Sequence, residues 1–177
     1  MLSKVVDWEI VLPNKLPFAR ILVHCRHFAN QKYAVEWVDT DRFIPLVEAQ
    51  RHRDPKIVIP EAMTWLPCDW EKMLHFLENS SVDGSIEMPV VSFNAARQVA
   101  TSAPKLFGLL PTGGTRNIVY PPYVGFVNGR HRTRAFERLG IKSFPVEIDV
   151  GAQQLLKQAC GSMSQPAPLA PRSLSQA

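Results

Sequence analysis

The stretch of chain from residue 123 to residue 149 limits the possible folds most strongly, because it carries the pattern strand, tight turn, helix and strand in under thirty residues. The apolar run Tyr123–Val127 is typical of a strand, and Asn128-Gly129 follows it at once as a turn. Arg130–Leu139 is compatible with a helix, Gly140 is a typical C-terminal stop, and Ser143–Asp149 has the pattern of the next strand. This unit predicts an α/β or α+β sheet.

The buried side of the predicted helix includes a cation. On a helical wheel, Ala135, Phe136 and Leu139 mark the side that packs on a core, and Arg132 lies on the same stripe one turn earlier. Burying an unpaired guanidinium is costly. We therefore expect Arg132 to meet an acidic side chain, a cluster of carbonyl groups or a bound anion.

The start of the same helix favours the bound anion. The N–H groups of a first helical turn have no partner inside the helix and lie at the positive end of its dipole. Gly129 lets the backbone approach a ligand closely, and His131 can donate a hydrogen bond to a phosphate oxygen. The alternative is that His131 is only a cap or a packing residue. Together these features predict a phosphate or nucleotide site formed by Asn128, Gly129, Arg130, His131 and Arg132.

A second stripe of the helix carries a cation at every fourth position. Together with a net charge of +4 and a pI of about 9.1, this stripe favours an anionic partner such as DNA. The alternative is a solvated face without a function. The predicted DNA-contacting residues are Arg130, Arg134, Arg138 and Lys142.

Three short apolar or alternating runs lie near the N-terminus, and the Pro, Asn and Gln residues between them favour turns. They predict an antiparallel meander or a hairpin pair in a β-rich extension that ends near residue 55. A further short strand is expected directly after this boundary. The expected strands are Trp8–Leu12, Ala19–His24, Tyr33–Val38 and Lys56–Pro60.

The middle of the chain contains the clearest amphipathic helix, because apolar residues recur at helical spacing from Asp69 to Asn79. Met88–Phe93 predicts a buried strand, and Asn94–Ala103 predicts a short helix that stops before a proline. Trp65 and Trp70 are candidates for stacking on bases. Their apolar neighbours favour core packing as the alternative.

Length and composition fit one domain with attachments, since 46% of the 177 residues are hydrophobic and 20% are charged. We expect an α+β fold with an N-terminal β-rich extension (1–55), a core domain (56–150) and a polar tail (151–177). The Pro, Ser and Gln residues from Gly161 onward predict a disordered tail. The three distant cysteines indicate neither a disulfide framework nor a zinc site. Without an export signal or a long apolar run, a cytoplasmic protein without membrane insertion is expected.

The sequence around the turn resembles the signature of the ParB/sulfiredoxin superfamily. The resemblance is carried by Val124–Ala135, Leu139-Gly140 and Phe144–Val146, and it extends over roughly residues 56–150. It implies a ParB/sulfiredoxin-like mixed-sheet core whose turn binds the phosphates of ATP or CTP, with ATP and Mg²⁺ as cofactors. Sulfiredoxins have a catalytic cysteine where this sequence has Arg130, so reduction of a sulfinic acid is not expected. The helix-turn-helix domain of partition proteins has no counterpart after Gly151.

Within that superfamily, the sequence looks most like the plasmid fertility inhibition factors, which place an N-terminal β-rich addition on a core of this size. This resemblance implies an ATPase and DNase that blocks conjugative or T-DNA transfer through a type IV secretion system. The implied partners are a nucleotide, DNA in single-stranded or transfer form, and components of the secretion or conjugation apparatus.

Two hypotheses for the site remain open. In the first, Arg130, His131 and Arg132 are catalytic: His131 and Arg132 hold phosphates with Gly129, and Arg130 offsets charge in the transition state. The metal ligands are unknown in this hypothesis, and the nearest carboxylates in the sequence are those of Glu137 and Asp149. In the second, the protein is a DNA- or partner-binding module that performs no chemistry.

Overall fold

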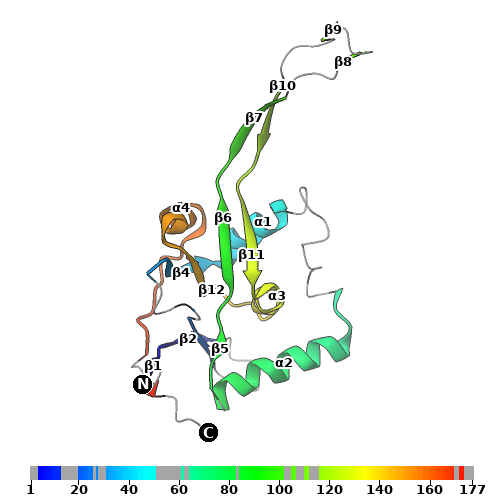
Figure 1. Cartoon of the computed structure of the whole chain (residues 1–177). Helices are drawn as coiled ribbons and strands as arrows, with labels where there is room; N and C mark the ends of the chain where they lie inside the picture. Colours follow the sequence, from blue (N-terminus) through cyan, green and yellow to red (C-terminus); the bar gives the residue numbers. More distant parts are fainter. Residues whose placement is uncertain are drawn as a thin grey trace.

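The computed structural model describes residues 4–12, 20–25, 27, 31–50, 61, 64–82, 84–101, 105–106, 110–111, 116–169 and 172–173 (Figure 1). Within these residues the protein has four helices and mixed sheets, so the predicted α+β class is confirmed. The strand expected at residues 56–60 and the boundary expected near residue 55 lie outside the described residues.

The central sheet has the strand order β11-β6-β12-β4. Strand β12 pairs antiparallel with β4 over its whole length and parallel with β6, and β6 pairs antiparallel with β11. The strands predicted at Tyr123–Val127 and Ser143–Asp149 are therefore confirmed. The bounds of the four strands are Tyr33–Asp39 (β4), Val90–Asn94 (β6), Tyr123–Asn128 (β11) and Ser143–Asp149 (β12).

A smaller sheet has the order β2-β3-β5, with β2 and β3 antiparallel and β3 and β5 parallel. The predicted hairpin of the first two strands is confirmed. The third strand expected in the N-terminal extension, β4, belongs instead to the central sheet, so residues 33–39 are part of the core. The strands of the smaller sheet are Asp7–Val11 (β2), Arg20–His24 (β3) and Ile86–Glu87 (β5).

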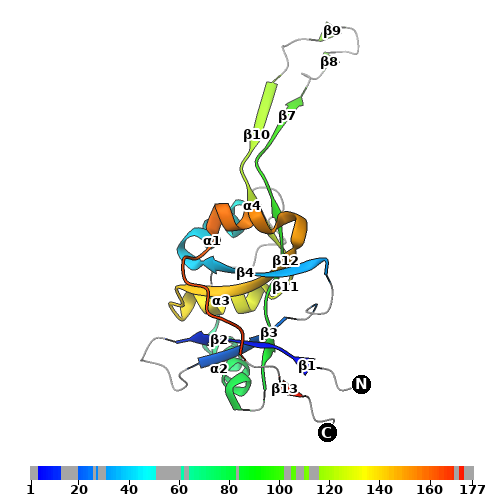
Figure 2. The same ribbon diagram turned by 90° about the vertical axis from the view of Figure 1, so that its left-hand side faces the viewer.

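The elements are stacked in layers (Figure 2). Helices α1 and α4 cover one side of β4 and β12, while α3 and the smaller sheet lie on the other side, and α2 lies beyond the smaller sheet. Helix α1 was not predicted. It begins where Asp39 accepts a hydrogen bond from the backbone N–H of Arg42 at 3.0 Å. The helices span Thr40–Ala49 (α1), Pro67–Val82 (α2), Arg130–Arg138 (α3) and Val150–Cys160 (α4).

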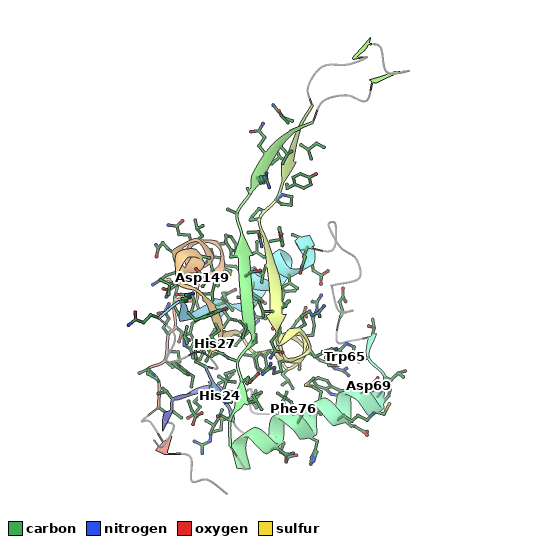
Figure 3. All side chains as sticks on the ribbon, in the orientation of Figure 1. His24, His27, Trp65, Asp69, Phe76 and Asp149 are labelled. Carbon is green, nitrogen blue, oxygen red and sulfur yellow. The ribbon has the colours of Figure 1, made fainter. Side chains whose placement is uncertain are left out.

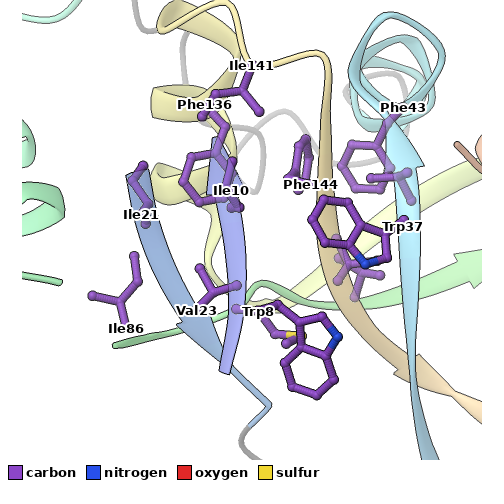
Figure 4. Packing of buried hydrophobic residues seen from close by; sticks show 14 of the residues in the cluster. Trp8, Ile10, Ile21, Val23, Trp37, Phe43, Ile86, Phe136, Ile141 and Phe144 are labelled. Carbon is purple, nitrogen blue, oxygen red and sulfur yellow. The ribbon is translucent and has the colours of Figure 1, made fainter. Parts of the chain in front are cut away.

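The hydrophobic core joins both sheets to α3 (Figure 4). The ring centroid of Phe144 on β12 lies 5.2 Å from that of Phe136 on α3 and 5.4 Å from that of Phe43 on α1. All three rings are fully buried, and each contributes roughly 2–3 kcal/mol of hydrophobic stabilisation. Because Phe136 anchors α3, the core also fixes the position of the turn at which that helix begins.

A buried carboxylate connects β12 with the end of the smaller sheet. Glu147 is completely buried, and it accepts hydrogen bonds from the backbone N–H of His27 at 2.6 Å and from the thiol of Cys25. The His27 ring nitrogen Nδ1 lies 2.9 Å from the other carboxylate oxygen. Burial, followed by the hydrogen bond to Glu147, raises the pKa of the Cys25 thiol. This thiol therefore serves as a hydrogen-bond donor within the core.

The short helix expected at Asn94–Ala103 is wrong, because this segment contains strand β7 (Arg97–Thr101). Strand β7 pairs antiparallel with β10 (Arg116–Tyr120), and this long-range pairing overrides the local helical preference. The two strands, called the arm below, project well beyond the central sheet (Figures 1 and 2). Near the far end, β8 (Lys105–Leu106) pairs with β9 (Leu110–Pro111).

The polar tail predicted to begin at residue 151 is corrected by helix α4. The carboxylate of Asp149 caps this helix, and Leu156 and Cys160 pack one turn apart into the core. The next residues, 161–169, were expected to be disordered, but in the structure they run back along both sheets. Their backbone N–H groups donate at 2.8 Å from Ser162 to the carbonyl of Trp37 and from Leu169 to the carbonyl of Asp7. Beyond them, β13 (Arg172–Ser173) pairs with β1 (Lys4–Val5).

Candidate phosphate-binding cavity

A cavity of about 590 Å³ lies between the start of α3, helix α2 and the end of the smaller sheet. This volume is within the range of about 300–1,000 Å³ that is usual for small-molecule sites. The structure brings together all the residues predicted for the phosphate site, because each of them lines this cavity. They are Asn128, Gly129, Arg130, His131 and Arg132.

The turn that opens the cavity depends on Gly129. Its φ angle of 87° lies in the left-handed region, where a side chain is strained, and a Cβ atom there would lie 2.6 Å from Cα of Pro89. Asn128 stabilises the turn, since its Oδ1 accepts from the N–H of Gly129 at 2.7 Å and its Nδ2 donates to Glu87 at 3.0 Å. The backbone therefore enters α3 in close contact with the strand segment beside it.

The N-terminus of α3 has no side-chain cap and no acidic residue in its first turn. By contrast, α1 is capped by Asp39 and α4 by Asp149. The first bond inside α3 runs from the N–H of Thr133 to the carbonyl of Gly129 at 3.0 Å. The N–H groups of the residues between them therefore have no partner inside the helix, and the positive end of the dipole adjoins the cavity.

Arg132 is a buried cation beside this helix end. It is only 9% exposed, and it forms no hydrogen bond or ion pair within the part of the chain that the structure describes. Burial lowers the pKa of its guanidinium, and the negative charge of Glu87 partly offsets this effect. The inward orientation predicted from the helical wheel is therefore confirmed. An anion in the cavity would supply the hydrogen-bond acceptors that this guanidinium lacks.

His131 lies on the exposed rim of the cavity against an aromatic neighbour. Its ring centroid is 5.9 Å from that of Trp65, and Trp65 in turn lies 6.2 Å from Trp70. The pKa of His131 is lowered, first by partial burial and then by the positive charge of Arg130. The ring is therefore neutral at neutral pH and can donate one hydrogen bond from a ring nitrogen.

Among the residues predicted to contact DNA, Arg134 is corrected, and Arg138 is found against an aromatic ring. Arg134 is 2% exposed and pairs with Glu48 of α1 and, at 2.9 Å, with Glu137. This stripe of α3 faces α1, so Arg134 is withdrawn from contact with DNA. The guanidinium of Arg138 lies 4.1 Å from the ring centroid of Trp70. Lys142 is exposed beside Asp41 at 3.4 Å.

The two carboxylates that are nearest to the site in the sequence have other partners. Glu137 pairs with Arg134, and Asp149 accepts from the backbone N–H of Gly151 at 2.8 Å. Glu87 is the carboxylate that lines the cavity, and sequence reasoning missed it. Among the described residues, no group of three or more His, Cys, Asp or Glu side chains is placed to hold a metal ion.

Sequence reasoning also missed the opposite wall of the cavity. This wall comes from α2, β5 and the end of β3, which contribute Met73, Phe76, Ser85, Ile86 and His24. Figure 3 shows Phe76 on α2 and His24 at the end of β3. The amphipathic pattern of α2 was visible in the sequence, but nothing local indicated that it would face the start of α3.

The fold and the site together define an α+β protein with a cationic cavity at a helix start. Residues 35–161, more than half of the chain, match the family model "Plasmid Fertility inhibition factor", and the chain therefore belongs to that family. None of the described helices is long and apolar enough to span a membrane.

One solved structure with a similar fold is the crystal structure of the gold(I) cyanide derivative of Oncogenic Suppression Activity Protein, a plasmid fertility inhibition factor. The match has a TM-score of 0.52 at 16% sequence identity and covers 93% of this chain and 72% of that one. At this identity the likeness shows the fold alone. No curated protein sequence matches the chain.

Proposed function

We propose that this fertility inhibition factor binds the phosphates of ATP and of DNA in the α3 cavity, hydrolyses both, and thereby blocks conjugative or T-DNA transfer through a type IV secretion system. The observation that carries the proposal is the buried guanidinium of Arg132, which lines an open cavity beside an uncapped helix start. Membership of the family supports the role in plasmid transfer.

The proposed roles follow from positions in the cavity wall. Arg132 and the backbone N–H groups of the first turn of α3 hold the phosphates, because both are preorganised donors that face an anion. His131 donates a further hydrogen bond from the rim. Arg130, which also lines the cavity, offsets the charge that develops on a transferred phosphoryl group.

Magnesium fits this proposal as a partner of the ligand. Mg²⁺ is commonly held by one or two carboxylates together with substrate phosphates. Glu87 provides a carboxylate at the cavity wall, hydrogen-bonded to Asn128 at 3.0 Å. Mg²⁺ would neutralise charge on the phosphates there, and Glu87 would be its protein ligand.

The charge distribution supports DNA as the macromolecular partner. Residues 88–136 contain no Asp or Glu, whereas they contain six Lys or Arg residues, and the whole chain has a net charge of only +4. Arg134 is paired with Glu48 and Glu137, and the remaining cations of this acid-free segment favour an anionic partner such as a phosphate backbone. Of the residues predicted to contact DNA, Arg130 and Lys142 are retained as DNA contacts in the proposal.

A titration of the purified chain with ATP tests the proposal. Binding, phosphate release and cleavage of single-stranded and double-stranded DNA are measured with and without Mg²⁺. We expect ATP to bind, and both ATP and DNA to be hydrolysed only when Mg²⁺ is present. Failure of ATP to bind at millimolar concentration would refute the nucleotide site.

A non-catalytic DNA- or partner-binding module is the second candidate. It is favoured by the hydrogen bond at 3.0 Å that already engages Glu87, the carboxylate at the cavity wall, with Asn128. In this case ATP and DNA bind, and DNA affinity falls steeply with added salt, but neither is hydrolysed. The same titration therefore separates the two functions.

The ionisation of His131 gives a pH-dependent prediction. A bound anion raises the pKa of this ring from its lowered value in the free protein, so ATP binding takes up a proton at acidic pH. We expect the ratio of ATP affinities of the wild type and His131→Gln to be constant at pH 7–8 and to rise as the pH falls below 6.5, the ordinary histidine value. The ratio cancels the ionisation of ATP itself. Isothermal titration at several pH values measures it, and a flat ratio would contradict the role of His131.

A further inference from the structure

We propose that the α2 side of the cavity is a nucleobase subsite, in which the ring of Phe76 stacks on the base of the nucleotide whose phosphates lie at α3. This inference rests on the proposed nucleotide-binding function. It assigns to α2 a role in ligand selection that the phosphate-binding turn alone does not provide.

The exposure of Phe76 is the first observation. Phe76 is 46% exposed, whereas its neighbour Leu77 is fully buried in the core. The ring therefore does not contribute to the core in the way that Leu77 does. Phe76 lines the cavity instead, and Met73, one turn earlier on the same side of the helix, lines it as well. An aromatic ring at a cavity wall offers a flat apolar face to a ligand.

The division of the cavity into two sides is the second observation. One side presents the cations and the backbone N–H groups at the start of α3. The other side is apolar, with Met73 and Phe76 from α2 and Ile86 from β5. Inorganic phosphate would use only the first side. A nucleotide matches both, because it carries an anionic chain at one end and a flat ring with exposed π faces at the other.

Two polar groups on the same wall are suited to recognising the edge of a base. Nδ1 of His24 and Oγ of Ser85 lie 2.9 Å apart, and both residues line the cavity. The hydrogen bond to Ser85 uses Nδ1, so Nε2 is the ring nitrogen left to meet a ligand. Figure 3 shows His24 and Phe76 in the same region of the molecule, on the smaller sheet and on α2. Stacking on Phe76 would thus be combined with an edge contact to His24.

A comparison of ATP with inorganic tripolyphosphate isolates the contribution of the base. Dissociation constants for both ligands are measured with the wild type, Phe76→Ala and Phe76→Trp. We expect Phe76→Ala to weaken ATP binding about tenfold, the size of a typical base-stacking contact, and to leave tripolyphosphate binding unchanged. Phe76→Trp should retain ATP binding, because it keeps a stacking surface.

Leu155 provides a matched control. It is 45% exposed, nearly the same fraction as Phe76, but it lies on α4 and does not line the cavity. Leu155→Ala should change neither dissociation constant. Because Phe76 is half exposed, Phe76→Ala should keep the unfolding temperature of the wild type, and thermal unfolding verifies this.

The possible results distinguish failure of the base subsite from failure of the phosphate site. If the wild type binds tripolyphosphate and Phe76→Ala leaves ATP affinity unchanged, the base subsite is overturned while the phosphate site stands. If the wild type binds neither ligand, the proposed nucleotide function fails, and the base subsite fails with it. Equal losses of ATP and tripolyphosphate affinity in Phe76→Ala would also overturn the base subsite, because the ring would then act on the phosphate end.

Discussion

Arg132→Met is expected to weaken ATP binding about a hundredfold or more and to leave the protein at least as stable as the wild type. Arg132 is 9% exposed as a whole residue and lines the cavity, so its guanidinium would donate two or more charge-assisted hydrogen bonds to a phosphate. Each such bond contributes about 1.5–3 kcal/mol, and two of them correspond to at least a hundredfold in affinity. Methionine preserves much of the length of the side chain without its charge.

Arg132→Met is expected to weaken ATP binding but not to lower the free energy of unfolding. Without a ligand, the wild type holds a partly desolvated guanidinium that has no hydrogen-bond acceptor within the described residues. Replacing such a group with an apolar side chain of similar shape removes its desolvation cost, whereas the attraction to Glu87 is lost. We expect a net change between zero and about 1 kcal/mol in favour of the variant. Urea unfolding without ligand measures this change.

Arg138→Met is the control on the same helix. Arg138 lies against the ring of Trp70 and does not line the cavity. Its replacement should therefore leave ATP affinity within about twofold of the wild type. Unchanged ATP affinity in Arg132→Met would show that the cavity does not bind phosphates through Arg132. A clear loss of stability in that variant would show that Arg132 has a structural role.

Gly129→Ala is expected to destabilise the protein by about 3 kcal/mol or more, while Gly140→Ala costs only about 1 kcal/mol. Both glycines have left-handed backbones, with φ angles of 87° and 72°. A Cβ atom at Gly140 meets nothing within 4 Å, so only the backbone strain remains. At Gly129 the added atom would lie 2.6 Å from Cα of Pro89.

Pro89 cannot move away easily, because its carbonyl accepts from the N–H of Glu147 at 2.8 Å inside the central sheet. The strain in Gly129→Ala must therefore displace the start of α3, and ATP affinity should fall together with stability. Urea unfolding of the two variants and the wild type tests this prediction. Equal losses of stability at the two glycines would mean that the contact with Pro89 does not determine the turn.

The sequence predicted the region around the cavity turn well because its signals are local. The alternation in Ser143–Asp149 and the left-handed glycine at Gly140 are visible within a few residues, and β12 has the predicted bounds. The inward orientation of Arg132 followed from helical spacing alone. These features need no information about partners elsewhere in the chain.

Prediction from the sequence was wrong where the contact that determines the structure is made by a residue far away in the chain. Arg134 was expected at the surface, but its partner Glu48 lies on α1, a helix that contains Pro45 and was not predicted from the sequence. The local sequence of β7 favours a helix, whereas its antiparallel pairing with β10 makes it a strand. The far wall of the cavity combines Phe76 and Glu87 with the turn, and no local pattern indicates that they meet.

The strand pairing is interrupted at the base of the arm. Asn94 pairs with Tyr123 in the central sheet, and Arg97 pairs with Tyr120 in the arm, so two residues separate these pairs on each strand. On one strand these two residues are Pro121-Pro122, which cannot donate ladder hydrogen bonds. The ladder is thus interrupted between the sheet and the arm, while the two strands keep equal spacing on both sides of the interruption. The reach of the arm is set by the covalent length of its strands, whereas its angle to the sheet is not fixed by ladder hydrogen bonds donated at the two prolines.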